Sequence, residues 1–111
     1  MDIKVLIEKL NLKPLNNYEN REVKGVCISD MISDVMASAK SGDLWLTIQT
    51  HKNIVPAANL VDISAIIISS AKEIPEETLD LANKHSIPIL SSEYSTYELA
   101  GRLYDMRIGI E

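Results

Sequence analysis

Hydrophobic residues occur along the chain in short blocks that alternate between helical and extended spacing. The first block follows Asp2, a residue type that caps helix N-termini, and it ends before Pro14. Its apolar members recur at the helical period and are Ile3, Leu6, Ile7 and Leu10. The pattern predicts an opening helix over residues 2–10.

Four later blocks have the length and the β-branched content of strands. They cover residues 24–29, 44–48, 64–68 and 87–90. The block 44–48 is apolar almost throughout, which is typical of a strand that is covered on both faces.

Each of these strands leads into a stretch with helical spacing. The first stretch carries Met31, Ile32, Val35 and Met36, and the second runs through Asn59 and Leu60. The third has Pro75 at its first helical position and ends at His85. The last opens with a capping box from Ser95 to Glu98 and continues through Leu99, Leu103 and Met106.

Strands that alternate with helices in this way indicate a parallel sheet with helices on both faces. We therefore expect an α/β fold, a three-layer α/β/α arrangement with a mainly parallel sheet. One domain over residues 1–111 accounts for the whole pattern.

Polar residues follow the predicted strands, and parallel strands bring such residues to one edge of the sheet, where open α/β sheets bind ligands. The candidate ligand-binding residues are Ser29, Asp30, Thr47, Gln49, Thr50, His51, Asn53, Ser69, Ser70, Ser91 and Ser92. Structural roles compete with this interpretation. Asp30 is better explained as a helix cap, and serines are common cap and turn residues.

The chemistry-bearing residues form no catalytic motif. His51 has no second histidine at metal-binding spacing, and His85 is placed to interact with a helix C-terminus. Cys27 lies in an apolar strand, where an unreactive buried thiol is expected. Neither a phosphate-binding Gly-rich loop with Lys nor a Gly-x-Ser-x-Gly motif occurs, so we expect no enzyme activity, no metal and no cofactor.

Charge and composition narrow the partners further. The net charge is −5, and the eleven Lys and Arg residues are scattered, which argues against nucleic acid as a partner. The longest apolar run, 66–68, is too short to cross a membrane, and the chain opens without a secretory pattern. A single cysteine fits a reducing, cytoplasmic location.

Several segments together resemble the DRTGG domain. They are 25–36 (GVCISDMISDVM), 42–51 (GDLWLTIQTH), 87–91 (IPILS) and 97–103 (YELAGRL), and the resemblance extends from about Glu22 to Ile108. DRTGG domains are accessory modules beside phosphate acetyltransferases and regulated pyrophosphatases, and are similar to the N-terminal domain of HPr kinase/phosphorylase. The resemblance implies regulation, nucleotide response or oligomer assembly.

The namesake motif of that family is altered in this chain. The Asp-Arg pair falls on Thr50-His51, and the paired glycines fall on Ser69-Ser70. The substitutions remove an arginine fork for phosphate and two positions of close backbone approach.

Two functions remain as hypotheses. The first is a non-catalytic regulatory module that forms a homodimer and binds an adenine nucleotide or another small anion at the strand ends. The second is a structural assembly protein that docks on a partner enzyme without a small ligand. Residues Gln49 to Asn53 favour the first, and the altered motif favours the second.

Overall fold

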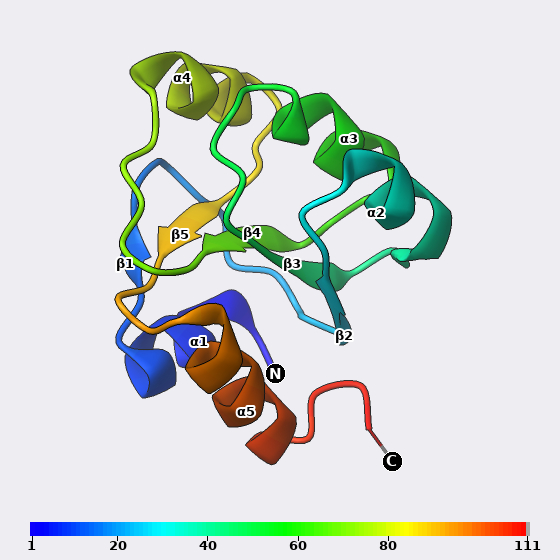
Figure 1. Ribbon diagram of the computed structural model, residues 1–111, viewed down its shortest axis with the longest axis vertical. Helices are drawn as coiled ribbons and strands as arrows, with labels where there is room; N and C mark the ends of the chain where they lie inside the picture. The colour runs from blue at the N-terminus through cyan, green and yellow to red at the C-terminus, as the bar shows by residue number, and fades with distance from the viewer. Residues whose placement is uncertain (111) are drawn as a thin grey trace.

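The computed structural model describes residues 1–110, and a five-stranded sheet in the order β1-β5-β4-β3-β2 lies at its centre (Figure 1). The strands are β1 (Lys13–Pro14), β2 (Gly25–Ile28), β3 (Asp43–Thr47), β4 (Ala65–Ile68) and β5 (Ile89–Ser91). β2 to β5 are parallel, and β1 joins β5 in the antiparallel direction. Glu111, the last residue of the expected domain, lies outside the described residues.

Helices cover both faces of this sheet and confirm the three-layer α/β/α fold. One face carries α2 (Ile32–Ser38), α3 (Ile54–Leu60) and α4 (Glu76–Lys84) (Figure 1). The other carries α1 (Ile3–Leu10) and α5 (Thr96–Asp105). Crossovers between neighbouring parallel strands share one hand, which places α2, α3 and α4 on the same face.

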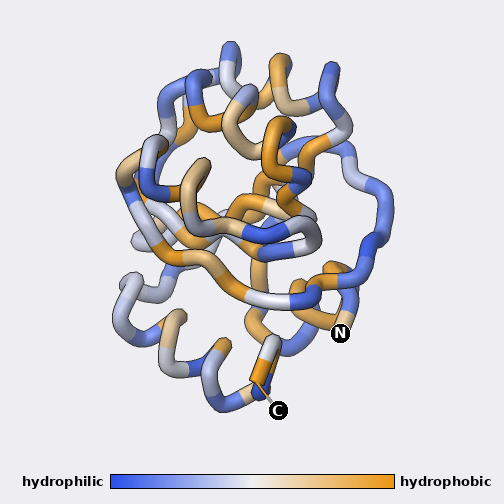
Figure 2. Tube along the Cα trace, turned by 90° about the vertical axis from the view of Figure 1, so that its right-hand side faces the viewer, coloured by the Kyte–Doolittle hydropathy of each residue, from blue (hydrophilic) through white to orange (hydrophobic). Residues whose placement is uncertain are grey.

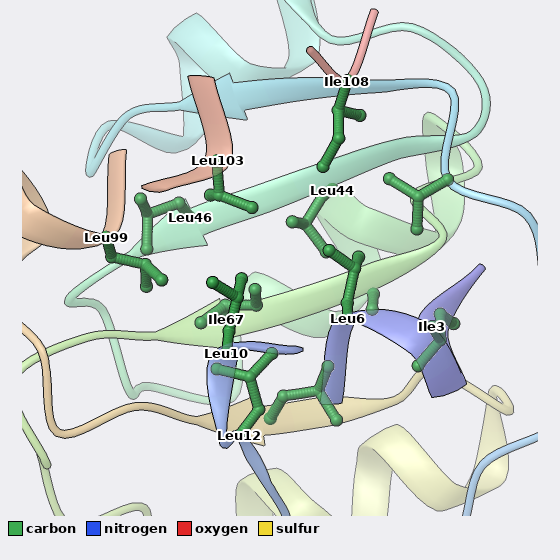
Figure 3. Packing of buried hydrophobic residues seen from close by; sticks show 13 residues of the cluster. Ile3, Leu6, Leu10, Leu12, Leu44, Leu46, Ile67, Leu99, Leu103 and Ile108 are labelled. Carbon is green, nitrogen blue, oxygen red and sulfur yellow. The ribbon is translucent and has the colours of Figure 1, made fainter. Parts of the chain in front are cut away.

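Each face of the sheet has its own hydrophobic core. Leu44, Leu46 and Ile67 point from the sheet toward α1 and α5, where they meet Leu6 and Leu99 (Figure 3). On the opposite face, Trp45, Ile66, Ile68 and Ile89 pack against Val35, Ile54 and Ala82 of the three crossover helices. The strands therefore run as mainly apolar segments through the middle of the molecule (Figure 2).

Two helix starts follow the sequence prediction closely. The Asp2 carboxylate accepts a hydrogen bond from the Val5 backbone N–H at 2.9 Å, and Ser95 Oγ accepts from the Glu98 N–H at 3.2 Å. Both side chains satisfy amide groups that lack a partner inside the helix.

Other details differ from the sequence prediction. β1 was not expected, because it has two residues and contains Pro14, which lacks a backbone donor. Pro75 occupies the cap position before α4, and Met106 follows the end of α5. Among residues 1–110, no helix combines the length and apolar character needed to cross a bilayer.

Core substitutions test this arrangement. Ile66 is fully buried in the central strand β4, so Ile66→Ala is expected to lower the free energy of unfolding by about 2–5 kcal/mol. Leu60 is 69% exposed on α3, and Leu60→Ala should change it by less than about 0.5 kcal/mol. Urea unfolding measures both, and equal effects would contradict the assigned core.

Candidate functional site at the carboxyl ends of the strands

The four parallel strands end at one edge of the sheet. Thr47 at the end of β3 is in register with Ile68 of β4, and Ile68 is in register with Ser91 of β5. The sequence-predicted residues follow these ends, but the structure divides them into three groups with different surroundings.

The first group joins the end of β2 to the end of β3. One Asp30 carboxylate oxygen accepts hydrogen bonds from Thr47 Oγ1 at 2.8 Å and from the Ile48 N–H at 3.0 Å. Gln49 Nε2 donates to the Asp30 carbonyl at 2.9 Å, and Ser29 Oγ accepts from the Met31 N–H at 3.2 Å. These contacts tie two neighbouring strand ends together.

The expected capping role of Asp30 is therefore wrong. Met31 holds the cap position of α2, and no side chain caps that helix. Asp30 bonds instead to Thr47 and Ile48, which belong to the next strand and the loop after it. Tertiary contacts of this kind are absent from the local spacing on which a cap prediction rests.

The second group, Thr50, His51 and Asn53, leads into α3 beside the start of α4. His51 Nδ1 accepts from the Asn53 N–H at 3.2 Å, and the Thr50 carbonyl accepts from Thr78 Oγ1 at 2.8 Å. The adjacent start of α4 is acidic, since Glu76 and Glu77 lie in its first turn.

The only lysine in this second loop is already engaged by a carboxylate. Lys52 Nζ lies 2.6 Å from Glu77, and this hydrogen bond, followed by the charge of Lys52, lowers the pKa of Glu77. An anion approaching this loop would therefore meet negative charge, so the loop is a poor phosphate site.

The third group lies where β4 and β5 end. Ser69 is buried, and its hydroxyl is 2.7 Å from Thr96 Oγ1, while Ser92 Oγ accepts from the Tyr94 N–H at 3.1 Å. Ser91 pairs with Lys13 of β1 and is half-buried. This group binds the loop after β4 to the loop after β5.

These two loops diverge to opposite faces of the sheet, because α4 and α5 lie on different sides (Figure 1). Such a divergence between neighbouring parallel strands is where α/β sheets form ligand crevices. Here the loops are joined by backbone hydrogen bonds, from the Ser70 N–H to the Tyr94 carbonyl and from the Ala71 N–H to the Ser92 carbonyl, both 2.8 Å. The crevice is therefore bridged by the chain itself.

The loop after β4 holds two adjacent residues in left-handed backbone conformation. φ is 64° at Ser70 and 50° at Ala71, a region that favours glycine. The pair of positions suited to glycine is thus Ser70-Ala71, one residue later than the Ser69-Ser70 pair inferred from sequence. Strained backbone of this kind concentrates at ligand clamps and switches.

Sequence reasoning missed three residues around this crevice. Thr96 bonds to Ser69, and Tyr94 supplies a carbonyl to Ser70. The Arg102 guanidinium stacks 4.2 Å from the centre of the Tyr94 ring and lies 3.6 Å from Glu98. The spacing of four residues between Glu98 and Arg102 was the only local signal for the contact between these two side chains.

The buried hydroxyls of Ser69 and Thr47 and the thiol of Cys27 are not arranged as nucleophiles. Ser69 and Thr47 bond to Thr96 and Asp30, and neither contacts a histidine base. Cys27 is half-buried, less covered than expected, and burial, with the nearby charge of Asp43, raises the pKa of its thiol. Within residues 1–110, no cluster of three or more His, Cys, Asp or Glu side chains could hold a metal ion.

Glycine substitutions test the strain at this site. Left-handed backbone costs a residue with a Cβ about 1–2 kcal/mol, so Ala71→Gly should raise the free energy of unfolding by about 0.5–1 kcal/mol after the greater entropy of unfolded glycine is subtracted. Ala37→Gly in α2 is the matched control and should lower it by a similar amount. Chemical denaturation of both variants measures the effect, and destabilisation by Ala71→Gly would contradict the strain.

Comparison with known proteins supports the resemblance noted in the sequence. The crystal structure of the CBS and DRTGG domains of the regulatory region of Clostridium perfringens pyrophosphatase, complexed with the activator diadenosine tetraphosphate, is similar with a TM-score of 0.69 and 16% identity. The match covers 91% of this chain and 44% of that one, so this chain spans less than half of that structure. No curated protein matches the sequence. The DRTGG domain profile matches residues 6–106, and the chain therefore belongs to the DRTGG domain family.

Proposed function

We propose that residues 1–111 form one DRTGG domain that acts as a non-catalytic, self-associating regulatory module. The observation that carries the proposal is a concentration of exposed apolar side chains beside the edge strand β2. Ile28, Met31 and Met36 are 47%, 64% and 44% exposed, and they lie on β2, on the turn after it and on α2. Exposed apolar groups gathered in one region are typical of association surfaces.

The likeness to a regulatory region supports the same proposal. The pyrophosphatase region of similar fold pairs its DRTGG domain with CBS domains and was crystallised with an activator. By this likeness of fold, we assign to the chain the role of influencing a partner enzyme through contact.

Ligand sensing is the second candidate function. It is favoured by the left-handed backbone at Ser70 and Ala71, which lies where neighbouring loops diverge to opposite faces. Ser70 is exposed there, whereas the Ser69 hydroxyl is already bonded to Thr96. A small anion such as an adenine nucleotide would bind at this crevice by loosening the bridge between the loops.

A thermal-shift screen separates the two functions. Purified protein is heated with adenine and guanine nucleotides, phosphate or sulfate at several protein concentrations. Self-association predicts a midpoint that rises with protein concentration, and ligand binding at one hundred times Kd predicts about 2.7 kcal/mol of added stability. A midpoint that changes neither with protein concentration nor with any added ligand would contradict both proposed functions.

Three variants locate any ligand response. Ser70→Asp adds a negative charge to the crevice and should abolish the response to anions. Ser70→Asn introduces a side chain of nearly the same shape as Asp but without the charge, and should retain the response to anions. The Thr50→Ala, His51→Ala double variant should leave the response intact. Loss of the response in the double variant alone would move the site to the loop before α3.

A further inference from the structure

The two edges of the sheet are protected to different degrees. β1 forms one edge with only Lys13 and Pro14, and a short strand with lysine and proline resists pairing with another chain. β2 forms the other edge with Gly25–Ile28, and its side chains are half-buried or exposed. An open edge with apolar residues is a template for strand addition.

A cavity of about 490 Å³ lies along the β2 edge. It is lined by Val26 and Ile28 of β2, by Lys40 after α2 and by Tyr104 of α5, among others. The C-terminal segment enters it at the start of β2, since a Cβ on Gly109 would lie 3.0 Å from Gly25 Cα. The part of the edge beyond that contact runs from Val26 to Ile28.

The hydrogen-bond pattern fixes which backbone groups of β2 face outward. The Ser29 N–H donates to the Leu46 carbonyl of β3 at 3.4 Å. Backbone direction alternates along a strand, so Cys27 and Ser29 direct their peptide groups toward β3. Val26 and Ile28 direct theirs away from the sheet, toward the cavity.

From this geometry we infer that the β2 edge pairs with β2 of a second copy of the chain in antiparallel register centred on Cys27. This inference deepens the proposed self-association by naming its surface. In this register Val26 lies opposite Ile28 of the second copy. The two residues of each such pair form two backbone hydrogen bonds, each from the N–H of one to the C=O of the other. The outward groups of both strands are then satisfied, and the two sheets become one continuous sheet across a two-fold axis.

The free length of the edge supports the same register. The C-terminal segment lies against the start of β2, since a Cβ on Gly109 would lie 3.1 Å from the Lys24 carbonyl oxygen and 3.0 Å from Gly25 Cα. The part of β2 beyond this contact is Val26 to Ile28, and Cys27 is its midpoint. A shift by two residues would leave one outward residue of each strand without its counterpart.

Apolar side chains flank the seam on both faces of the joined sheet. Met36 of α2 stands on one side, and Tyr104 of α5, which is 64% exposed, lines the cavity on the other. Pairing about the two-fold axis would place each of them near its counterpart in the second copy. The apolar area that this region exposes would then be covered.

Cys27 makes this register directly measurable. It would face Cys27 of the second copy in a non-hydrogen-bonded pair, with Cα atoms about 4.5 Å apart, within the range that a disulfide spans. Copper-phenanthroline oxidation should therefore convert the protein to a covalent dimer, and mildly alkaline pH is used because burial raises the pKa of the Cys27 thiol. A Cys27→Ser, Leu60→Cys variant, whose cysteine lies on exposed α3, should cross-link far less at equal concentration.

A second pair of variants tests the edge without cysteine chemistry. Ile28→Lys places a charged side chain on the seam and should convert the dimer to the 12.3 kDa monomer in sedimentation velocity. Leu60→Lys adds the same charge on α3 and should leave the dimer intact. Circular dichroism of both variants verifies that the fold is kept.

The outcomes separate this inference from the proposed function. A dimer that Ile28→Lys leaves intact and whose Cys27 fails to cross-link would overturn the β2 seam while self-association stands. A protein that remains monomeric at every concentration would overturn both, and the nucleotide screen would still decide ligand sensing on its own.

Discussion

The fold depends on covering the face of the sheet that the crossover helices leave open. β2 to β5 follow one another in order, so α2, α3 and α4 all lie on one side. Leu44, Leu46 and Ile67 would remain in water on the other side, and α1 and α5, from the two ends of the chain, are the described helices that cover them. Burial of apolar surface contributes about 25 cal/mol per Å² to the free energy of unfolding. Because α1 and α5 supply this burial, the stability of the central strands depends on both ends of the chain.

Covering that face also creates the divergence between β4 and β5. The chain must change sides after β5, so its loop departs from the loop after β4 and exposes their backbone. Hydrogen bonds of Ser70 and Ala71 to the loop after β5 satisfy that backbone, at the cost of left-handed conformations at both residues. The polar residues at the strand ends thus serve first to hydrogen-bond the loops to one another, and a ligand must compete with these internal hydrogen bonds.

Periodicity predicted most of the elements, the layer arrangement and the common edge at which the polar residues gather. It succeeded because helical and strand spacing reflect burial, as in β3, where every residue is buried. It failed where a residue's partner is distant in sequence. Asp30 is typical of a cap by its local context, yet its partner Thr47 is 17 positions away. The bridge between Ser69 and Thr96, 27 positions apart, was equally invisible.

The segments next to α1 and α5 also determine how each edge of the sheet is covered. α1 leads directly into β1, which closes the β5 edge with Lys13 and Pro14. α5 leads into residues 108–110, where Gly109 lies against Gly25 at the start of β2. Because both ends of the chain are committed to the α1 and α5 face, no further element of residues 1–110 covers Val26 to Ile28. An edge strand with exposed apolar neighbours is costly for an isolated domain, and pairing with an identical edge is the simplest way for this fold to complete its sheet.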